Sequence, residues 1–186
     1  MLSRTLQLKR EAIAQRWLYS VYDSYAPETA KFLKNKKDPF DNPVGARMVA
    51  STAGISEQLC ADALDAEAVC GHLIEIIKVR AVQDMSPSKA MSFVFFLKDA
   101  ARQELGQEAD AALLAEIDRR VDQIALFAFD IYVKCREQMY QLRVNEVKRK
   151  VKTIIEKFNK ENCGVDPEDE PGEDAPLTST QRGVEL

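Results

Sequence analysis

Residues 108–160 read EADAALLAEIDRRVDQIALFAFDIYVKCREQMYQLRVNEVKRKVKTIIEKFNK, and this stretch decides the fold. It contains no proline and no glycine, the two residues that most often break helices. It is followed within four residues by Cys163-Gly164, where glycine favours a helix stop. We therefore predict one long helix over residues 108–160.

Apolar residues form two stripes along this helix, each with the three-and-four spacing of a helical face. The first stripe comprises Val121, Ile124, Ala125, Ala128, Ile131, Cys135, Met139 and Leu142. The second comprises Val144, Val147, Val151, Ile154 and Phe158. Between the stripes the pattern skips one residue, which turns the apolar face by roughly 100°. We predict that the first half of the helix packs into a domain, whereas the second half projects from it and needs another partner.

The composition favours an all-α protein. With 186 residues the chain can form one domain with a real hydrophobic core. Seven glycines and seven prolines are few, and no alternating run rich in valine or threonine is present. We expect a helical bundle.

Periodicity and cap signals place further helices before the long one. We expect them at residues 6–25, 28–33, 44–64, 66–83 and 87–105. Asp65 is a candidate N-cap, and Ser86-Pro87 combines an N-cap with proline at the first helical position. Gly54 is expected to interrupt the third helix. The loop over residues 34–43 has two prolines, and we expect Phe40 to anchor it to the body.

Targeting and redox signals indicate a cytoplasmic protein. The most apolar run, residues 90–97, is much shorter than the ~20 residues that cross a bilayer. The N-terminus carries charges among its leucines and has no signal-peptide pattern. Four cysteines without C-x-x-C spacing are expected to be scattered free thiols.

We expect no enzyme activity, no metal ion and no cofactor. His72 is the one histidine, and a di-iron bundle requires two Glu-x-x-His motifs. A haem or metal role for His72 stays open beside the simpler one of a hydrogen-bonded or exposed histidine. The chain has no G-x-S-x-G motif, no P-loop and no G-x-G-x-x-G motif.

The second half of the long helix carries a basic surface formed by Lys148, Arg149, Lys150, Lys152 and Lys157. Charged positions around the second stripe are typical of a dimeric coiled coil. An acidic partner or an anionic membrane surface would also suit these charges. We expect no nucleic-acid partner, because the segment has no interleaved aromatic residues and no DNA-reading motif.

Residues 164–186 differ in composition from the rest of the chain. They carry seven carboxylates and one arginine, a charge of −6. Because the whole chain carries −4, residues 1–163 carry +2. Three prolines and no large apolar cluster in this segment predict a disordered acidic tail, which could mask the basic surface.

Several segments together resemble the N-terminal domain of RsbT co-antagonist (RsbR-type) stressosome regulators. The similar segments are residues 16–18, 37–45, 80–90, 93–98, 129–132, 135–137 and 143–149. Within this resemblance we expect structural roles for Asp38, Pro39, Phe40, Asn42, Pro43, Arg80, Gln83, Asp84, Ser86 and Pro87. Arg80, Gln83 and Asp84 would join two helices by hydrogen bonds.

The resemblance implies a globin-like helical sensor domain without haem, which in such proteins is dimeric and leads into a phosphorylatable STAS domain. We expect a stand-alone domain here, with a helical sensor at residues 1–143, a projecting basic helix at 144–163 and the acidic tail at 164–186. The predicted function is a non-enzymatic, dimeric sensor or adaptor in stress signalling, with a protein partner such as a separate STAS-type regulator. The alternatives are a small-molecule or haem-binding sensor and a peripheral-membrane adaptor.

Overall fold

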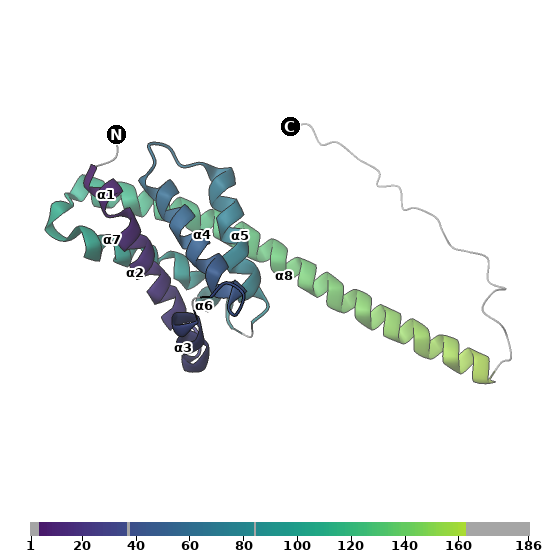
Figure 1. Cartoon of the computed structure of the whole chain (residues 1–186). Helices are drawn as coiled ribbons and strands as arrows, with labels where there is room; N and C mark the ends of the chain where they lie inside the picture. The colour runs from purple at the N-terminus through teal and green to yellow at the C-terminus, as the bar shows by residue number, and fades with distance from the viewer. Residues whose placement is uncertain (1–3, 37, 84, 163–186) are drawn as a thin grey trace, which may run out of the picture. The chain divides into compact units, whose positions relative to one another are not determined.

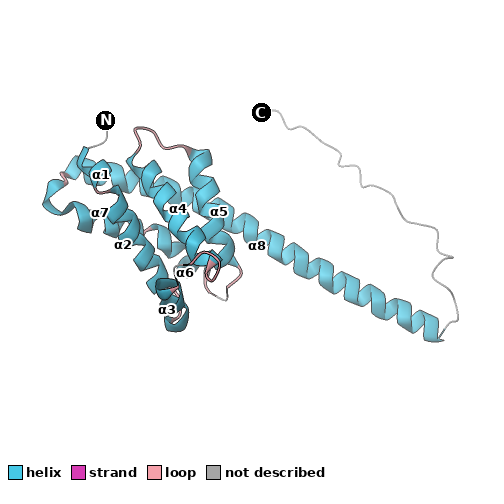
Figure 2. Ribbon diagram, viewed as in Figure 1, coloured by secondary structure: helices cyan, strands magenta, loops and turns pink. Residues whose placement is uncertain are grey.

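The computed structural model describes residues 4–36, 38–83 and 85–162. Over these ranges every regular element is a helix and no strand is present, which confirms the all-α class (Figure 2). The globin-like arrangement stays a prediction. Asp84 and the acidic segment 164–186 lie outside the described residues. The chain divides into two units, Met1–Gln141 and Leu142–Leu186, which are taken separately below.

Figure 1 labels the helices of the first unit. In chain order the α-helices are α1 (Arg4–Leu8), α2 (Arg10–Asp23), α3 (Pro27–Asn35), α4 (Pro43–Cys60), α5 (Ala66–Ala81), α6 (Pro87–Met91), α7 (Phe96–Leu105) and α8 (Ala111–Asn162). Two 3-10 turns, η1 (Ser92–Val94) and η2 (Gly106–Glu108), flank α7. Helix α8 continues into the second unit, so the long helix predicted from residues 108–160 is confirmed.

Three expected helices differ in their course. The expected helix over residues 6–25 is divided at Lys9 into α1 and α2. Gly54 does not interrupt α4, which continues to Cys60. The expected helix over residues 87–105 is broken at η1, where backbone carbonyls are taken by side chains of other helices. Trp17 donates from Nε1 to the carbonyl of Phe93 at 2.7 Å, and their rings stack.

Two of the predicted helix starts are confirmed by their hydrogen bonds. The Asp65 carboxylate accepts from the backbone N–H groups of Glu67 and Ala68, at 2.9 and 3.2 Å. Ser86 Oγ accepts from the N–H of Lys89 at 3.3 Å, and Pro87 follows at the first helical position. Each cap satisfies N–H groups that have no partner inside the helix.

The expectation that Phe40 anchors the loop is wrong, because Phe40 is 94% exposed. The loop is held instead by Asn42, which is 2% exposed. Its Nδ2 donates to the carbonyl of Lys36 at 2.8 Å, and its Oδ1 accepts from the N–H of Gly45 at 2.8 Å. An amide has both a donor and an acceptor, so this single side chain ties the loop to the start of α4.

The core of the first unit is closed by the first stripe of α8. Val121, Ile124 and Ala128 are fully buried, and Ile131 is nearly so. The stripe then fades: Cys135 and Met139 are half-buried, and Leu142 is 69% exposed. The prediction that the first half of this helix packs into a domain is therefore correct up to Met139.

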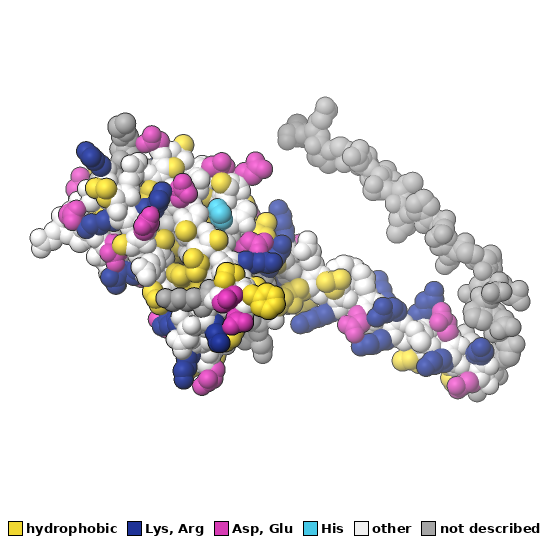
Figure 3. Space-filling view, viewed as in Figure 1, with side chains coloured by type: hydrophobic (Ala, Val, Ile, Leu, Met, Phe, Trp, Pro, Cys, Tyr) yellow, Lys and Arg dark blue, Asp and Glu magenta, His cyan; other side chains and the backbone are white. Residues whose placement is uncertain are grey.

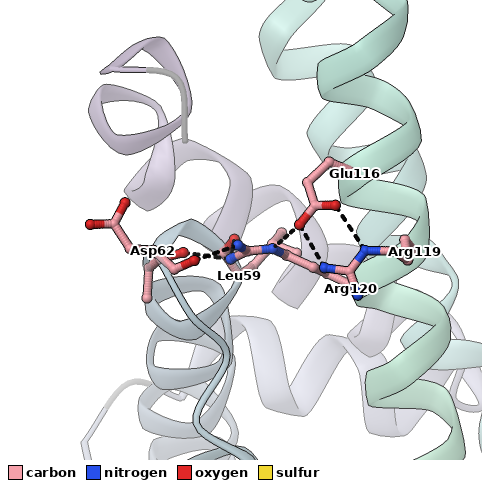
Figure 4. Close-up of polar contacts among 6 residues, drawn as sticks. Leu59, Asp62, Glu116, Arg119 and Arg120 are labelled. Atoms are coloured by element: carbon pink, nitrogen blue, oxygen red, sulfur yellow. Dashed lines mark hydrogen bonds and ion pairs between the residues drawn. The ribbon is translucent and has the colours of Figure 1, made fainter. Parts of the chain in front are cut away.

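Arg120 connects α8 to the end of α4 and is 5% exposed. Its Nη1 donates to the carbonyls of Leu59 and Ala61, and its Nη2 donates to the carbonyl of Asp62 at 2.9 Å (Figure 4). The last carbonyls of a helix have no partner within it, so the guanidinium supplies the missing donors.

Glu116 orients Arg120 from one turn earlier on α8. It accepts from Nε of Arg120 at 2.7 Å and from both Nε and Nη2 of Arg119. The hydrogen bonds from Arg119, and next the one from Arg120, lower the pKa of Glu116 to about 2. Glu116 therefore stays ionised at neutral pH and holds the guanidinium in place.

Arg80 performs a similar task at the end of α6 and is 1% exposed. It donates from Nη2 to the carbonyl of Lys89 at 2.9 Å and from Nε to that of Ala90 at 2.7 Å. A third bond, from Nη1 to Ser24 Oγ at 2.9 Å, reaches the end of α2. The rings of Tyr25 and Phe93 lie 4.9 and 5.2 Å from the guanidinium carbon.

We expect Arg120→Met to lower the free energy of unfolding by about 2–3 kcal/mol, because the carbonyls at and just after the end of α4 lose their donors. Urea denaturation followed by circular dichroism measures this change. Arg119→Met is the matched control, since Arg119 shares Glu116 but is exposed. We expect it to have little effect. Equal losses in the two variants would contradict the role given to Arg120.

Candidate functional site

The second unit presents an apolar row that we call the seam: Val144, Val147, Val151, Ile154 and Phe158. Each seam residue exposes between 46% and 64% of its surface. Residues 142–161 are all exposed. Intervals of three and four residues place the seam on one face of α8.

The apolar row on this register begins earlier than the sequence suggested. Val147 and Ile154 are seven residues apart. Continuing this spacing towards the N-terminus gives Tyr140, Val133 and Leu126. Tyr140 and Leu126 are 52% and 68% exposed, and Val133 is half-buried. The outward-facing row therefore overlaps the inward-facing first stripe along α8, instead of replacing it after Leu142. A strict seven-residue repeat is the pattern of supercoiled helices.

The basic surface lies beside the seam. Lys148, Arg149, Lys150, Lys152 and Lys157 are all exposed. Lys150 pairs with Glu146 at 2.7 Å, and Lys152 lies 3.9 Å from Glu156. The hydrogen bond from Lys150 lowers the pKa of Glu146. Figure 3 shows dark blue basic and yellow apolar side chains along this segment.

The first unit contains a groove of about 480 Å³ between α2, α3 and α4. Its walls are mostly apolar and include Leu18, Leu33 and Val49. Hydrophobic side chains gather on the face of the molecule where these helices lie (Figure 3). This volume falls in the range of small-molecule sites. No pattern in the sequence pointed to the groove, because its walls come from three separate helices.

His72 packs against Gly54, where α4 and α5 approach closely. A Cβ atom on Gly54 would lie 2.1 Å from Nε2 of His72, so glycine leaves space for the imidazole. His72 does not line the groove. Among the described residues, no group of three or more His, Cys, Asp and Glu side chains is arranged to hold a metal ion.

The other residues singled out in the sequence lie at helix ends and in loops. Asp38 accepts from the N–H of Phe40 at 2.8 Å, next to the exposed Pro39. Pro43 and Pro87 are the first residues of α4 and α6. Gln83 is half-buried and follows α5, with its backbone N–H donating to the carbonyl of Arg80 at 3.3 Å.

Sequence reasoning missed Arg120 and the role of Arg136. Arg136 donates from Nη1 to the carbonyl of Ala81, the last residue of α5, at 3.1 Å. For Arg120 the sequence did contain a signal: this arginine lies on the inward face of the amphipathic pattern, among Ile117, Val121 and Ile124. A cation at such a position needs buried acceptors.

Comparison with protein families matches residues 11–147 to the RsbT co-antagonist protein rsbRD N-terminal domain. The match covers well over half of the chain, and it includes all of α2 but its first residue and every helix from α3 to α7. The chain belongs to this family. The family consists of regulatory sensor domains, which implies a stressosome-type signalling module. No curated protein and no solved structure matches the chain.

Of the helices within residues 4–36, 38–83 and 85–162, none is long and apolar enough to span a bilayer.

We expect Gly54→Ala to destabilise the protein, because the new methyl group displaces the His72 ring. In a His72→Ala background the same change should stabilise by about 0.5–1 kcal/mol, the usual gain for alanine over glycine in a helix. Thermal unfolding of the four proteins in this cycle gives the coupling.

The matched control is Gly71→Ala on α5, where an added Cβ meets nothing within 4 Å. It should stabilise equally in both backgrounds. If Gly54→Ala changes the stability by the same amount with and without the imidazole, contact with His72 is not the reason for glycine at position 54.

Proposed function

We propose that this chain is a dimeric, non-enzymatic sensor or adaptor of the cytoplasmic stressosome type, and that two copies pair along the seam. The single observation that carries the proposal is the row of exposed branched and aromatic side chains from Val144 to Phe158. The family supports the signalling role. In this proposal the first unit is a globin-like body that receives the signal, and the dimer acts on a separate protein partner.

Pairing is favoured by the hydrophobic effect. Removing apolar surface from water stabilises by about 25 cal/mol per Å², so an exposed row of large side chains favours association. A helix of some twenty exposed residues is also only marginally stable in water without packing. Burying the seam against a second copy would stabilise residues 142–162 as a helix.

The pattern of side chains suits a coiled coil. Val144, Val151 and Phe158 take the a positions of a heptad, and Val147 and Ile154 take the d positions. Lys150 and Lys157 occupy the flanking g positions.

The basic surface leaves room for a second contact. Its side chains remain at the edge of a seam-paired dimer, where an acidic protein partner could reach them. Contact with an anionic membrane through the same residues stays a prediction.

We expect Ile154→Asp to convert the dimer into a monomer, because two carboxylates would face each other in the seam. Thr153→Asp introduces the same charge at the preceding residue, which lies off the seam, and this variant should remain dimeric. Sedimentation velocity at micromolar concentration measures the mass of each protein.

A monomeric wild-type protein would contradict the pairing. Dimerisation of Ile154→Asp at wild-type strength would place the interface elsewhere. Circular dichroism of the variants checks that the helices of the first unit remain folded.

A further inference from the structure

We infer that the groove between α2, α3 and α4 binds an elongated amphipathic molecule with an apolar body and one anionic head group, such as a medium-chain carboxylate. This site does not depend on the pairing proposed above, because all of its walls belong to the first unit.

The groove is elongated because α2 and α4 run antiparallel. Arg10, at the start of α2, lies 3.9 Å from Glu57, near the end of α4. At the opposite end, Tyr22 lies against Gly45, near the start of α4. Groove residues on α2 extend from Glu11 to Tyr22, a rise of roughly 16 Å along the helix. An extended alkyl chain fits this length better than a compact ring system.

The walls suit an apolar chain. Leu18, Leu33 and Val49 supply large apolar side chains. Ala14, Ala46 and Ala53 line the groove with side chains too small to fill it. Neighbouring helices therefore leave space between them, and an apolar ligand gains free energy by removing these walls from water.

The two ends differ in charge. At the α3 end the groove is lined by Lys34 and Lys36, beside the N-terminal turn of α4. At the other end it is lined by Glu11 and Gln15. Lys34 and Lys36 each pair with an exposed carboxylate, Asp23 and Asp41, which water can replace as a partner. Charge complementarity directs an anionic head group towards the lysines and away from Glu11.

Tyr22 offers a hydrogen bond at the same end. Its side chain is 4% exposed, and its hydroxyl donates to the carbonyl of Gly45 at 3.5 Å, the weak limit of such a bond. Burial, followed by the neighbouring Tyr19 and Tyr25, raises the pKa of Tyr22. The phenol is therefore a neutral donor at physiological pH, ready for a better acceptor.

Titration calorimetry with sodium decanoate tests the site. We expect wild-type protein to bind decanoate, and Ala46→Trp, which fills the groove, to weaken binding at least about tenfold. Ala112→Trp is the matched control on an exposed position of α8 and should bind as wild type. If Ala46→Trp does not fold, Val49→Trp replaces it.

A second pair of variants tests the head group. The double variant Lys34→Gln/Lys36→Gln should bind decanoate about tenfold more weakly and bind decan-1-ol as tightly as wild type. The control is Lys31→Gln with Lys78→Gln, two exposed lysines off the groove.

Three results would overturn the inference. One is the absence of decanoate binding, and another is equal binding in the groove-filled and control variants. The third is an equal loss of affinity for decan-1-ol and decanoate in the lysine variants, which would show that the lysines do not recognise an anionic head group. A change of molar mass in Ala46→Trp without a change in decanoate binding would make the groove a protein-docking surface instead.

Discussion

Buried helix ends need hydrogen-bond donors, and this requirement organises the first unit. The last carbonyls of an α-helix have no partner within it, and leaving them unpaired away from water costs about 1–3 kcal/mol each. Three arginines meet the need: Arg120 at α4, Arg136 at α5 and Arg80 at α6. Each comes from a different helix than the one it completes, so packing and helix termination depend on each other.

Helix α8 has a special place in this arrangement because it supplies two of the three arginines. Its inward face carries Arg120, Arg136 and the buried stripe from Val121 to Ile131. Its outward register carries Leu126, Tyr140 and then the seam. The residues that complete the core and the residues proposed to pair therefore belong to one continuous hydrogen-bonded helix.

Local signals in the sequence were sufficient for much of the fold. The lack of helix breakers over residues 108–160 predicted α8, and Asp65 and Ser86-Pro87 predicted two helix starts, because each effect lies within a few residues. The break at η1 was not predictable in this way. Residues 92–94 contain no glycine or proline, and the break is stabilised by Trp17 and Arg80, which are distant in sequence.

The roles of individual side chains and the groove between helices were less predictable than the helices themselves. Phe40 was expected to be anchored because large aromatic residues usually are, yet the small Asn42 holds the loop. Gly54 looked like a helix breaker, and its role became clear only with His72 opposite. The seam was visible in the sequence because it lies on one helix. The groove was not, since Leu18, Leu33 and Val49 meet only after folding.

The claim that a second copy covers the seam is tested most directly by amide hydrogen exchange over residues 144–158 at several protein concentrations. Exchange reports local opening, and an uncovered helical segment frays readily. The account predicts slow exchange in this segment at high concentration and faster exchange on dilution, in step with the fall in molar mass. Exchange that is equally fast at every concentration, while Val121 and Ile124 remain protected, would show that the seam has no partner copy and would contradict the account.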